Sequence, residues 1–417
     1  SLPTDVSGDL LARFPGGGTA LLQILDRGTE GVRCVLEPEE VPAFGVLPFE
    51  LEPGSWDADS VAPRASESCL ENALFRVDLG PDGTIEQILD KRENRALVPE
   101  GLRANDWQFF QDGPERESAW NIHESFETRR YENDASPAIR VLCAGPVMAS
   151  VLIEGRFRSS RYRQTITLYR QTPRIDIRVW IDWQERHVLL KAAFPICVRS
   201  ARATYEVQFG AIDRPTTRNT SWEQQKFEVA AQRWVDVSED GYGVSLLNDG
   251  RYGHDVYGNT LRLTLLRGPE YPDPQADLGE HTFAYSIYPH QGTWGAAGTV
   301  RRAAEFNVPM QVVSGNGNGP ALVQLTQGVF SVEGRGAVLE TVKPADDGDG
   351  MILRFYESQG GRGRVTLTTP LPVASVEACN LVEERGDPIE SDEHTFEFEL
   401  DPYQIRTFRA RFGAVED

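Results

Sequence analysis

Residues 165–182 read TITLYRQTPRIDIRVWID, and this stretch indicates the fold class. From residue 175 to 182, apolar side chains stand at every second position, which is the period of a β-strand with one buried face. The alternating apolar residues are Ile175, Ile177, Val179 and Ile181. The run at 165–169 has a similar character, and QTPR at 171–174 contains a proline suited to a turn. We therefore predict a long antiparallel hairpin.

Strand patterns recur toward both ends of the chain. The run FRVDL at 75–79 is followed by PDG at 81–83 and by a second apolar run, which predicts another hairpin. Apolar alternation at 395–400 and 406–412 predicts two late strands, whereas 294–306 predicts only a short helix weakened by glycines. These features predict an all-β fold built from sandwiches rather than a parallel α/β fold.

Composition limits the classes of partner. The 417 residues carry a formal net charge of −21, so phosphate backbones are repelled and nucleic-acid binding is not expected. No apolar run approaches the roughly 18 to 20 residues that span a bilayer, so no membrane partner is expected. The opening SLPTDVSGDL does not read as a signal peptide, and the missing initiator Met suggests a piece of a longer chain.

Cysteine and histidine usage argues against both disulfides and a metal site. The five cysteines contain no CxxC pair, which is typical of a reduced protein of the cytoplasm. The six histidines never form an HxH, HxxxH or HExxH pattern, so no metal site is expected in this chain. Two polar combinations remain: His254 beside Asp255, and Asp277 four residues before His281.

The segment 248–294 is the candidate for ligand contacts. Two polar loops rich in Gly, Pro and Tyr flank a short strand there, and loops on a rigid sheet commonly carry binding residues. A retaining glycosidase needs two carboxyls about 5 Å apart. The loop-borne candidates are Asp249, Asp255, Asp273 and Asp277. Loop aspartates more often cap turns, so the sequence selects no pair.

Aromatic residues with polar tips are a second sign of a sugar site, because a flat apolar face beside hydrogen-bonding groups suits a sugar ring. Tyr252 stands out, since glycines lie close on both sides of it in DGRYG. The other candidates could equally pack the ends of a sandwich. They are Trp107, Trp120, Trp222, Trp234, Tyr257, Tyr271 and Trp294.

Several motifs, in the same order along the chain, closely resemble glycoside hydrolase family 38, the α-mannosidases. FQDGPERESAWNI at 110–122 is similar to a DxPxxxDAWDI stretch of that family, with departures at Glu117, Ser118 and Asn121. VSLLNDGRYG at 244–253 looks typical of its cytosolic and vacuolar-type branch. Further similar segments are VPAFGVLPFEL at 41–51, LENALFRVDLGPDGTI at 70–85, LLRGPEYPDPQADLG at 265–279 and VKPADDGDGMILRFYE at 342–357.

The resemblance implies a particular all-β architecture. It implies a large antiparallel supersandwich of the galactose-mutarotase type, flanked by smaller β-sandwich domains. Polar stretches at 52–64 and 314–320 separate these units. The predicted limits are 1–55 for a small N-terminal β-sandwich, 66–310 for the supersandwich and 320–417 for a C-terminal β-sandwich.

The resemblance also implies that the chemistry lies elsewhere. Family members are retaining α-mannosidases that need a divalent cation, usually zinc. Their nucleophile, acid/base carboxylate and metal ligands belong to an N-terminal region that would precede Ser1. No catalytic residue and no metal ligand is therefore expected in this chain, and Zn²⁺ or another divalent cation would be bound by the missing domain.

What the β half would supply is a wall of the sugar site. It would pack against its own N-terminal catalytic domain and meet a mannose-containing oligosaccharide, and self-association into a homo-oligomer stays open. The predicted substrate-binding residues on the rim are Trp234, Arg251, Tyr252, His254, Asp273 and Asp277.

Two alternatives belong to other functional classes. A mutarotase-like sugar isomerase could use His254 or His281 with Asp255 or Asp277 as acid and base. A free-standing carbohydrate-binding module would bind sugar through the exposed aromatics alone. An exposed apolar patch beside the 248–281 loops would favour the α-mannosidase reading, because a severed domain interface should leave one.

Overall fold

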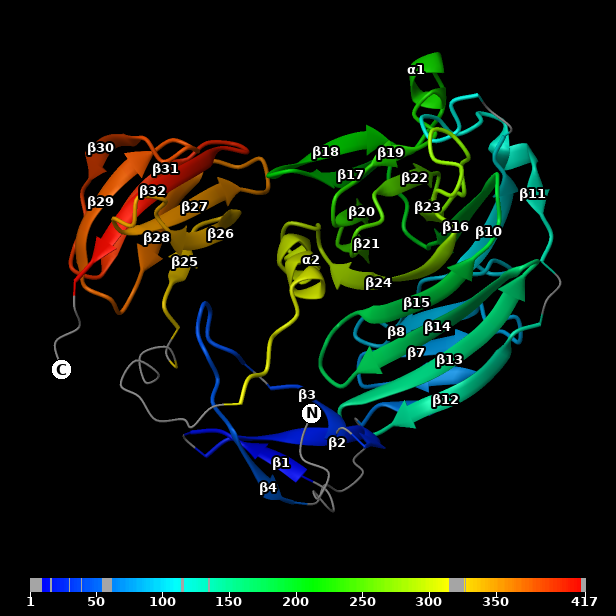
Figure 1. The fold of residues 1–417 in the computed structure, drawn as a ribbon, viewed down its shortest axis with the longest axis horizontal. Helices are drawn as coiled ribbons and strands as arrows, with labels where there is room; N and C mark the ends of the chain where they lie inside the picture. Colours follow the sequence, from blue (N-terminus) through cyan, green and yellow to red (C-terminus); the bar gives the residue numbers. More distant parts are fainter. Residues whose placement is uncertain are drawn as a thin grey trace.

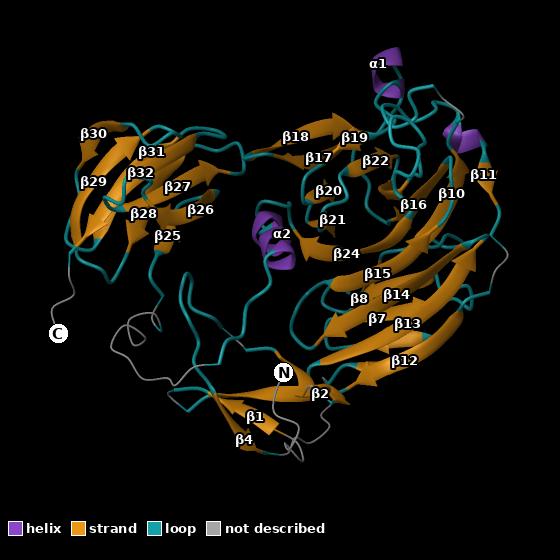
Figure 2. Ribbon diagram, in the orientation of Figure 1, coloured by secondary structure: helices purple, strands orange, loops and turns teal. Residues whose placement is uncertain are grey.

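The computed structural model is built almost entirely from antiparallel β-sheets, which confirms the all-β prediction (Figures 1 and 2). It describes residues 10–413 apart from 16, 30, 39, 55–61, 114–115, 134–135, 315–325 and 327. The predicted domain limits at 55 and 320 lie outside the described residues. So does most of the two polar stretches that suggested them. Within the described part, no helix is long and apolar enough to cross a membrane.

A nine-stranded sheet forms one layer of the large central sandwich. The predicted hairpin at 165–182 lies inside it, with Leu168 opposite Ile175. In spatial order the strands are β12 (Ala138–Ala144), β13 (Met148–Phe157), β14 (Ser160–Tyr169), β15 (Ile175–Trp183), β24 (Gly279–Gln291), β21 (Tyr242–Asn248), β20 (Trp234–Glu239), β17 (Arg202–Val207) and β18 (Gly210–Pro215).

Two smaller sheets form the second layer. The six-stranded sheet contains β11 (Arg130–Tyr131), β10 (Asp106–Gln111), β16 (Val188–Pro195), β23 (Thr260–Leu266), β22 (Gly253–Tyr257) and β19 (Val229–Ala230). The five-stranded sheet contains β5 (Arg64–Ser66), β6 (Cys69–Glu71), β7 (Phe75–Leu79), β8 (Ile85–Asp90) and β9 (Arg95–Ala96), so the hairpin predicted from 75–79 is confirmed. Phe75, Leu190 and Ile177, one from each sheet, share a single buried core, because period-two alternation turns one face of every sheet inward.

Helices are few. The main one, α2 (Thr299–Asn307), begins later than predicted, because residues 294–298 form turns and Gly298 adopts a left-handed φ of 70°. Its buried Ala303 packs on the outer face of the nine-stranded sheet against Trp234 and Leu247. The short α1 (Ser221–Gln224) and the 3-10 turn η1 (Phe126–Thr128) lie in connections near the six-stranded sheet (Figure 2).

The N-terminal part is a four-stranded sheet joined to the central sandwich. Its strands, in spatial order, are β3 (Gly31–Leu36), β2 (Thr19–Gly28), β1 (Leu10–Arg13) and β4 (Glu50–Pro53). The buried Gln23 makes the joint: its Nε2 donates to the Met148 carbonyl at 3.0 Å, and its Oε1 accepts from the backbone N–H groups of Val147 and Met148.

The C-terminal part is a two-sheet sandwich (Figure 1). One sheet contains β25 (Ser331–Glu333), β28 (Gly363–Thr368) and β31 (Thr395–Leu400). The other contains β26 (Ala337–Pro344), β27 (Met351–Glu357), β32 (Ile405–Phe412), β29 (Val373–Cys379) and β30 (Arg385–Ile389). The two late strands predicted from alternation, β31 and β32, lie in different sheets, and Phe396 meets Phe408 between them at 5.4 Å.

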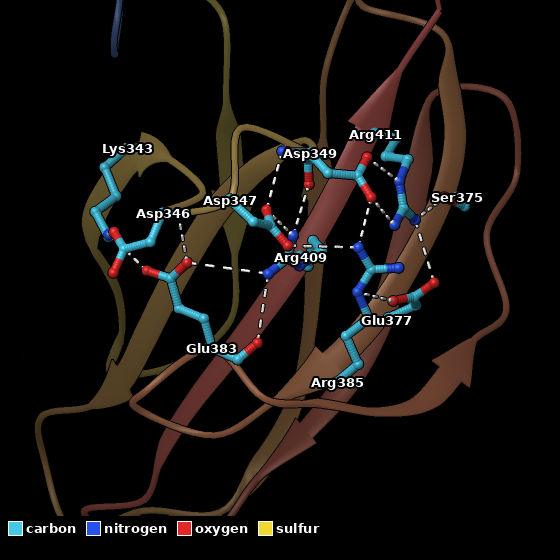
Figure 3. A network of polar contacts seen from close by, with 10 residues as sticks. All are labelled: Lys343, Asp346, Asp347, Asp349, Ser375, Glu377, Glu383, Arg385, Arg409 and Arg411. Atoms are coloured by element: carbon cyan, nitrogen blue, oxygen red, sulfur yellow. Dashed lines mark hydrogen bonds and ion pairs between the residues drawn. The ribbon is translucent and has the colours of Figure 1, made fainter.

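An ion-pair network joins two turns of this sandwich, the β26–β27 turn at 345–350 and the β29–β30 turn at 380–384 (Figure 3). Arg409 donates to the Asp347 carboxylate at 2.6 Å and to the Asp349 carbonyl at 2.9 Å. Arg411 donates two hydrogen bonds, of 2.7 and 2.8 Å, to the Asp349 carboxylate. We call this set the turn network; its members are Lys343, Asp346, Asp347, Asp349, Ser375, Glu377, Glu383, Arg385, Arg409 and Arg411.

Candidate functional site

The loop at 249–252 crosses from the nine-stranded sheet to the six-stranded sheet. Asn248, at the end of β21, holds it: its Oδ1 accepts from the backbone N–H groups of Gly250 and Arg251, each at 2.9 Å. Its Nδ2 donates to the Gln232 carbonyl at 3.2 Å. The loop is therefore fixed by its own side chain, and Tyr252 is presented on it with 54% of its surface exposed.

Arg251 and Asp277 belong to one neighbourhood. The Arg251 guanidinium lies 4.3 Å from the centre of the Phe283 ring. Burial lowers the pKa of Arg251, and the charges of Asp277 and Asp249 act in the opposite direction. A cation beside a carboxylate and an exposed tyrosine is an arrangement that can hydrogen-bond and stack on a sugar.

The two predicted aspartates at 273 and 277 both shape their own loop. Asp273 accepts a hydrogen bond from the backbone N–H of Gln275 at 2.9 Å, as a turn cap does. Asp277 has a φ of 61°, and its carboxylate accepts from the backbone N–H groups of Arg267 and Gly268. Their carboxylates therefore do the turn-capping work that is common for loop aspartates.

Trp234 and His254 lie in the interior rather than on the rim. Trp234 is completely buried beneath α2, with its ring 4.9 Å from that of Trp294. His254 is completely buried as well, and its Nδ1 lies 3.2 Å from the Tyr252 carbonyl. Burial lowers the pKa of His254 to about 4, so its imidazole is neutral near pH 7.

Asp255 is also enclosed, on the opposite face of β22 from His254. The Nζ of the fully buried Lys191 lies 2.9 Å from its Oδ2, and Arg262 donates to its Oδ1 at 2.8 Å. Burial raises the pKa of Asp255, but Lys191 and Arg262 outweigh that effect, and the net direction is down. Lys191 also pairs with Glu228. Both oxygens of Asp255 are engaged by cations and its pKa is lowered, which makes this carboxylate a weak base.

The loop at 267–279 is clamped by a second segment that the rim prediction left out. Arg267 donates twice to the buried Asp112, at 2.7 and 2.5 Å. Ser118 Oγ accepts from the backbone N–H groups of Glu270 and Tyr271, and the Ala119 N–H donates to the Tyr271 carbonyl. Ser118 was noted in the sequence only as a departure from the family motif.

Beside this clamp, Trp120 extends into solvent. It is 91% exposed, next in the chain to an alanine that is hydrogen-bonded to Tyr271, which is itself more than half exposed. Trp120 and Tyr271 were candidates by residue type, but their proximity depends on a long-range contact between 112–122 and 267–272. We use the term aromatic rim for Trp120, Tyr252 and Tyr271.

Potential metal ligands and thiols both occur among the described residues. In them, no group of three or more His, Cys, Asp or Glu side chains is placed to hold a metal ion. All five cysteines are free, and burial raises the pKa values of Cys34, Cys69, Cys197 and Cys379. Thiols of that kind are poor nucleophiles near neutral pH.

Comparison with known proteins identifies the class. Residues 70–275 match the model of the glycosyl hydrolases family 38 C-terminal domain, and residues 336–408 match that of the family 38 C-terminal beta sandwich domain. The two regions correspond to the central and C-terminal sandwiches. The chain belongs to glycoside hydrolase family 38, and it matches the C-terminal domains of that family.

Particular relatives are α-mannosidases. Alpha-mannosidase 2C1 of Mus musculus is 35% identical over 346 residues, which cover 81% of this chain and 33% of the relative. Alpha-mannosidase G of Dictyostelium discoideum is 30% identical over 82% of this chain and 32% of its own length. The chain thus spans about a third of the length of these relatives.

A solved structure shares the fold. The crystal structure of an alpha-mannosidase from Enterococcus faecalis V583 superposes with a TM-score of 0.76 at 17% identity, covering 97% of this chain and 51% of that one. Its agreement extends across all three parts of the molecule, which supports the architecture described above.

Proposed function

We propose that this chain is the non-catalytic C-terminal part of a retaining α-mannosidase that hydrolyses terminal α-D-mannosyl residues. In this proposal it forms one side of the sugar-site rim and supports a catalytic part that it does not contain. The observation that carries the proposal is the aromatic rim, held by clamped loops, in a chain that spans only a third of its α-mannosidase relatives. Its substrate would be a mannose-containing oligosaccharide.

The rim residues divide into those that can touch a ligand and those that support them. Tyr252 and Arg251 are carried on the loop that Asn248 fixes. Trp120 and Tyr271 are placed by Ser118 and its neighbours. Asp273 and Asp277 set the course of the 267–279 loop. In this proposal Trp234 and His254 do not contact the ligand, and they contribute only by packing in the interior.

The zinc or other divalent cation belongs to the catalytic part in this proposal. The described residues do not fit such an ion, because no trio of suitable ligands converges. The cytoplasm is the proposed compartment, since the scattered cysteines are free, as is usual for proteins of a reducing compartment.

The test compares the 417-residue chain with the full-length enzyme. The purified chain is expected to fold and to show no turnover of an aryl α-mannoside, while the full-length enzyme turns it over and loses activity in EDTA. EDTA-sensitive turnover by the chain alone would contradict the proposal.

A matched pair of variants in the full-length enzyme tests the rim itself. Tyr252→Ala is expected to lower kcat/KM for an oligosaccharide by about tenfold, the equivalent of about 1.4 kcal/mol, without changing thermal stability. Leu381→Ala, at an exposed turn of the C-terminal sandwich, is the control and should leave both unchanged. Equal kinetics for the two variants would remove Tyr252 from the rim.

A carbohydrate-binding module is the second candidate, because exposed aromatic rings alone can hold a sugar. It predicts quenching of the chain's tryptophan fluorescence by mannose oligosaccharides at millimolar concentration or below. The mutarotase-like alternative has less support. His254 is buried, and Asp255 is ion-paired with Lys191 and Arg262. The His281 imidazole lies 2.8 Å from the Asp277 carbonyl, and the Asp277 carboxylate accepts from the backbone of its own loop.

A further inference from the structure

A segment with exposed apolar side chains follows the central sandwich. Residues 308–313, VPMQVV, follow α2 and belong to neither a helix nor a strand. Their four large apolar side chains are exposed to the extent of 74% for Val308, 67% for Met310, 73% for Val312 and 83% for Val313. Single exposed apolar residues are ordinary, but four within six positions concentrate exposed apolar surface, as interaction surfaces do.

The amides of residues 310–313 also lack partners within the described part of the chain. Among the described residues, none accepts a hydrogen bond from the N–H groups of residues 310–313. A stretch with exposed apolar side chains and amides that bond to none of the described residues can pair with another segment.

The start of the segment is nevertheless firmly placed. The Val308 N–H donates to the Ala304 carbonyl at 2.8 Å, which closes the last turn of α2. Asn307 Nδ2 donates both to the Ala303 carbonyl and to the Asn248 carbonyl, each at 2.9 Å. Since Asn248 also fixes the loop at 249–252, the apolar segment starts next to the residue that holds this loop.

We infer that residues 308–313 form the contact strand by which this β portion holds the catalytic part of the same enzyme. The inference rests on the proposed function. The occupant follows from three observations. The relatives are about three times as long as the aligned region, the matching models are C-terminal domains, and the segment starts beside Asn248, which fixes the 249–252 loop. Burial of residues 308–313 in that interface would remove their apolar side chains from water and give their amides hydrogen-bond partners.

Hydrogen exchange measured by mass spectrometry tests the inference. In the full-length enzyme, the amides of 310–313 are expected to exchange at least about tenfold more slowly than in the 417-residue chain. Equal, unprotected exchange in both molecules would overturn it. Because the wild-type sequence is used in both, no variant has to fold for this comparison.

A pair of valine variants in the full-length enzyme supplies a second measurement. Val312→Asp places a charge in the inferred interface and is expected to lower the thermal midpoint and to abolish the protection of 310–313. Val382→Asp changes a similarly exposed valine in the C-terminal sandwich and should do neither. Protection that survives Val312→Asp unchanged would count against the interface.

The outcome is separable from that of the proposed function. Protection of 310–313 in a full-length protein without mannosidase activity would refute the proposed function and leave the contact strand standing. Full mannosidase activity with unprotected amides would support the proposed function and overturn the contact strand.

Discussion

Gly268 shows how a single backbone position fixes the course of the 267–279 loop. It has a left-handed φ of 70°, and its carbonyl accepts from the His187 N–H at 2.9 Å. A Cβ at this position would collide with the backbone oxygen of Glu185. The 267–279 loop can therefore approach the β15–β16 connection only where residue 268 has no side chain.

Two glycine variants separate the conformational cost from the collision. Gly258 also has a left-handed φ, of 61°, but a Cβ there meets nothing within 4 Å. Gly258→Ala is expected to cost about 1 kcal/mol in the free energy of unfolding, and Gly268→Ala at least about 3 kcal/mol because a backbone must also move. Urea unfolding of the two variants measures this. Similar losses would show that the loop is not held at Gly268.

Residue identity alone predicted which candidate residues are exposed only in part. Tyr252 was found because its neighbours in DGRYG are small, which is a local property. Residue type placed Trp234 and His254 at the surface, but both are buried. Both faces of β20 and of β22 are covered, and the alternation of a strand does not reveal a helix or sheet that packs on its second face. Trp120 depends on the clamp between 112–122 and 267–272, a contact between residues about 150 positions apart.

At the scale of elements, the strands were predictable and their partners were not. Period-two alternation located β7, β14, β15, β31 and β32, because a strand with one buried face must alternate. It carried no information on which sheet each strand joins, and consecutive strands β31 and β32 enter different sheets. The helix α2 was predicted too early, since the glycines at 295 and 298 favour turns.

The turn network should make the C-terminal sandwich sensitive to acid. Arg411 and Arg385 lower the pKa of Asp349, Arg409 lowers that of Asp347, and Lys343 lowers that of Glu383. A carboxyl with a lower pKa in the folded state stabilises the fold above its unfolded pKa, near 4, and loses that effect as pH falls further. We expect the thermal midpoint of this sandwich to hold from pH 7 to about pH 4.5 and to drop below pH 4.

Calorimetry between pH 7 and pH 3 with two variants checks this expectation. Asp349→Asn removes the central carboxylate, so it should lower the midpoint at pH 7 and flatten the dependence below pH 4. Asp387→Asn changes an exposed carboxyl on β30 outside the network and should keep the dependence of the wild type. An acid dependence that is unaffected by Asp349→Asn would assign it to other groups.

At the scale of the molecule, the β17–β18 turn connects the two sandwiches. Phe209 in that turn meets Tyr356 of β27 edge-on at 5.5 Å. Gln359 of the C-terminal sandwich donates to the carbonyl of Gly295, which lies in the turns before α2, at 3.2 Å. The C-terminal sandwich therefore contacts the central sandwich through the β17–β18 turn and through the segment before α2. It also contacts the N-terminal part, where the Phe44 and Phe330 rings lie 5.9 Å apart.

Loss of the Phe209 ring should uncouple the unfolding of the two sandwiches. Phe209→Ala removes a ring that belongs to neither hydrophobic core, so each core is left intact. We expect the calorimetric transition to split or broaden, because cooperativity between domains depends on their interface. Ile212→Ala, on the neighbouring β18, is the control and should retain the wild-type profile. Identical profiles for both would mean that the turn does not couple them.

The Trp234–Trp294 pair gives this molecule an optical reporter of its own. The two indoles lie 4.9 Å apart at 36°, one on the nine-stranded sheet and the other just before α2. A fixed aromatic pair of this kind produces near-ultraviolet circular dichroism that vanishes when packing is lost. Trp120 and Trp222, in contrast, are open to soluble quenchers. Dichroism therefore follows the seating of α2 and the segment that leaves it, while quenching follows the exposed loops, in one unlabelled sample.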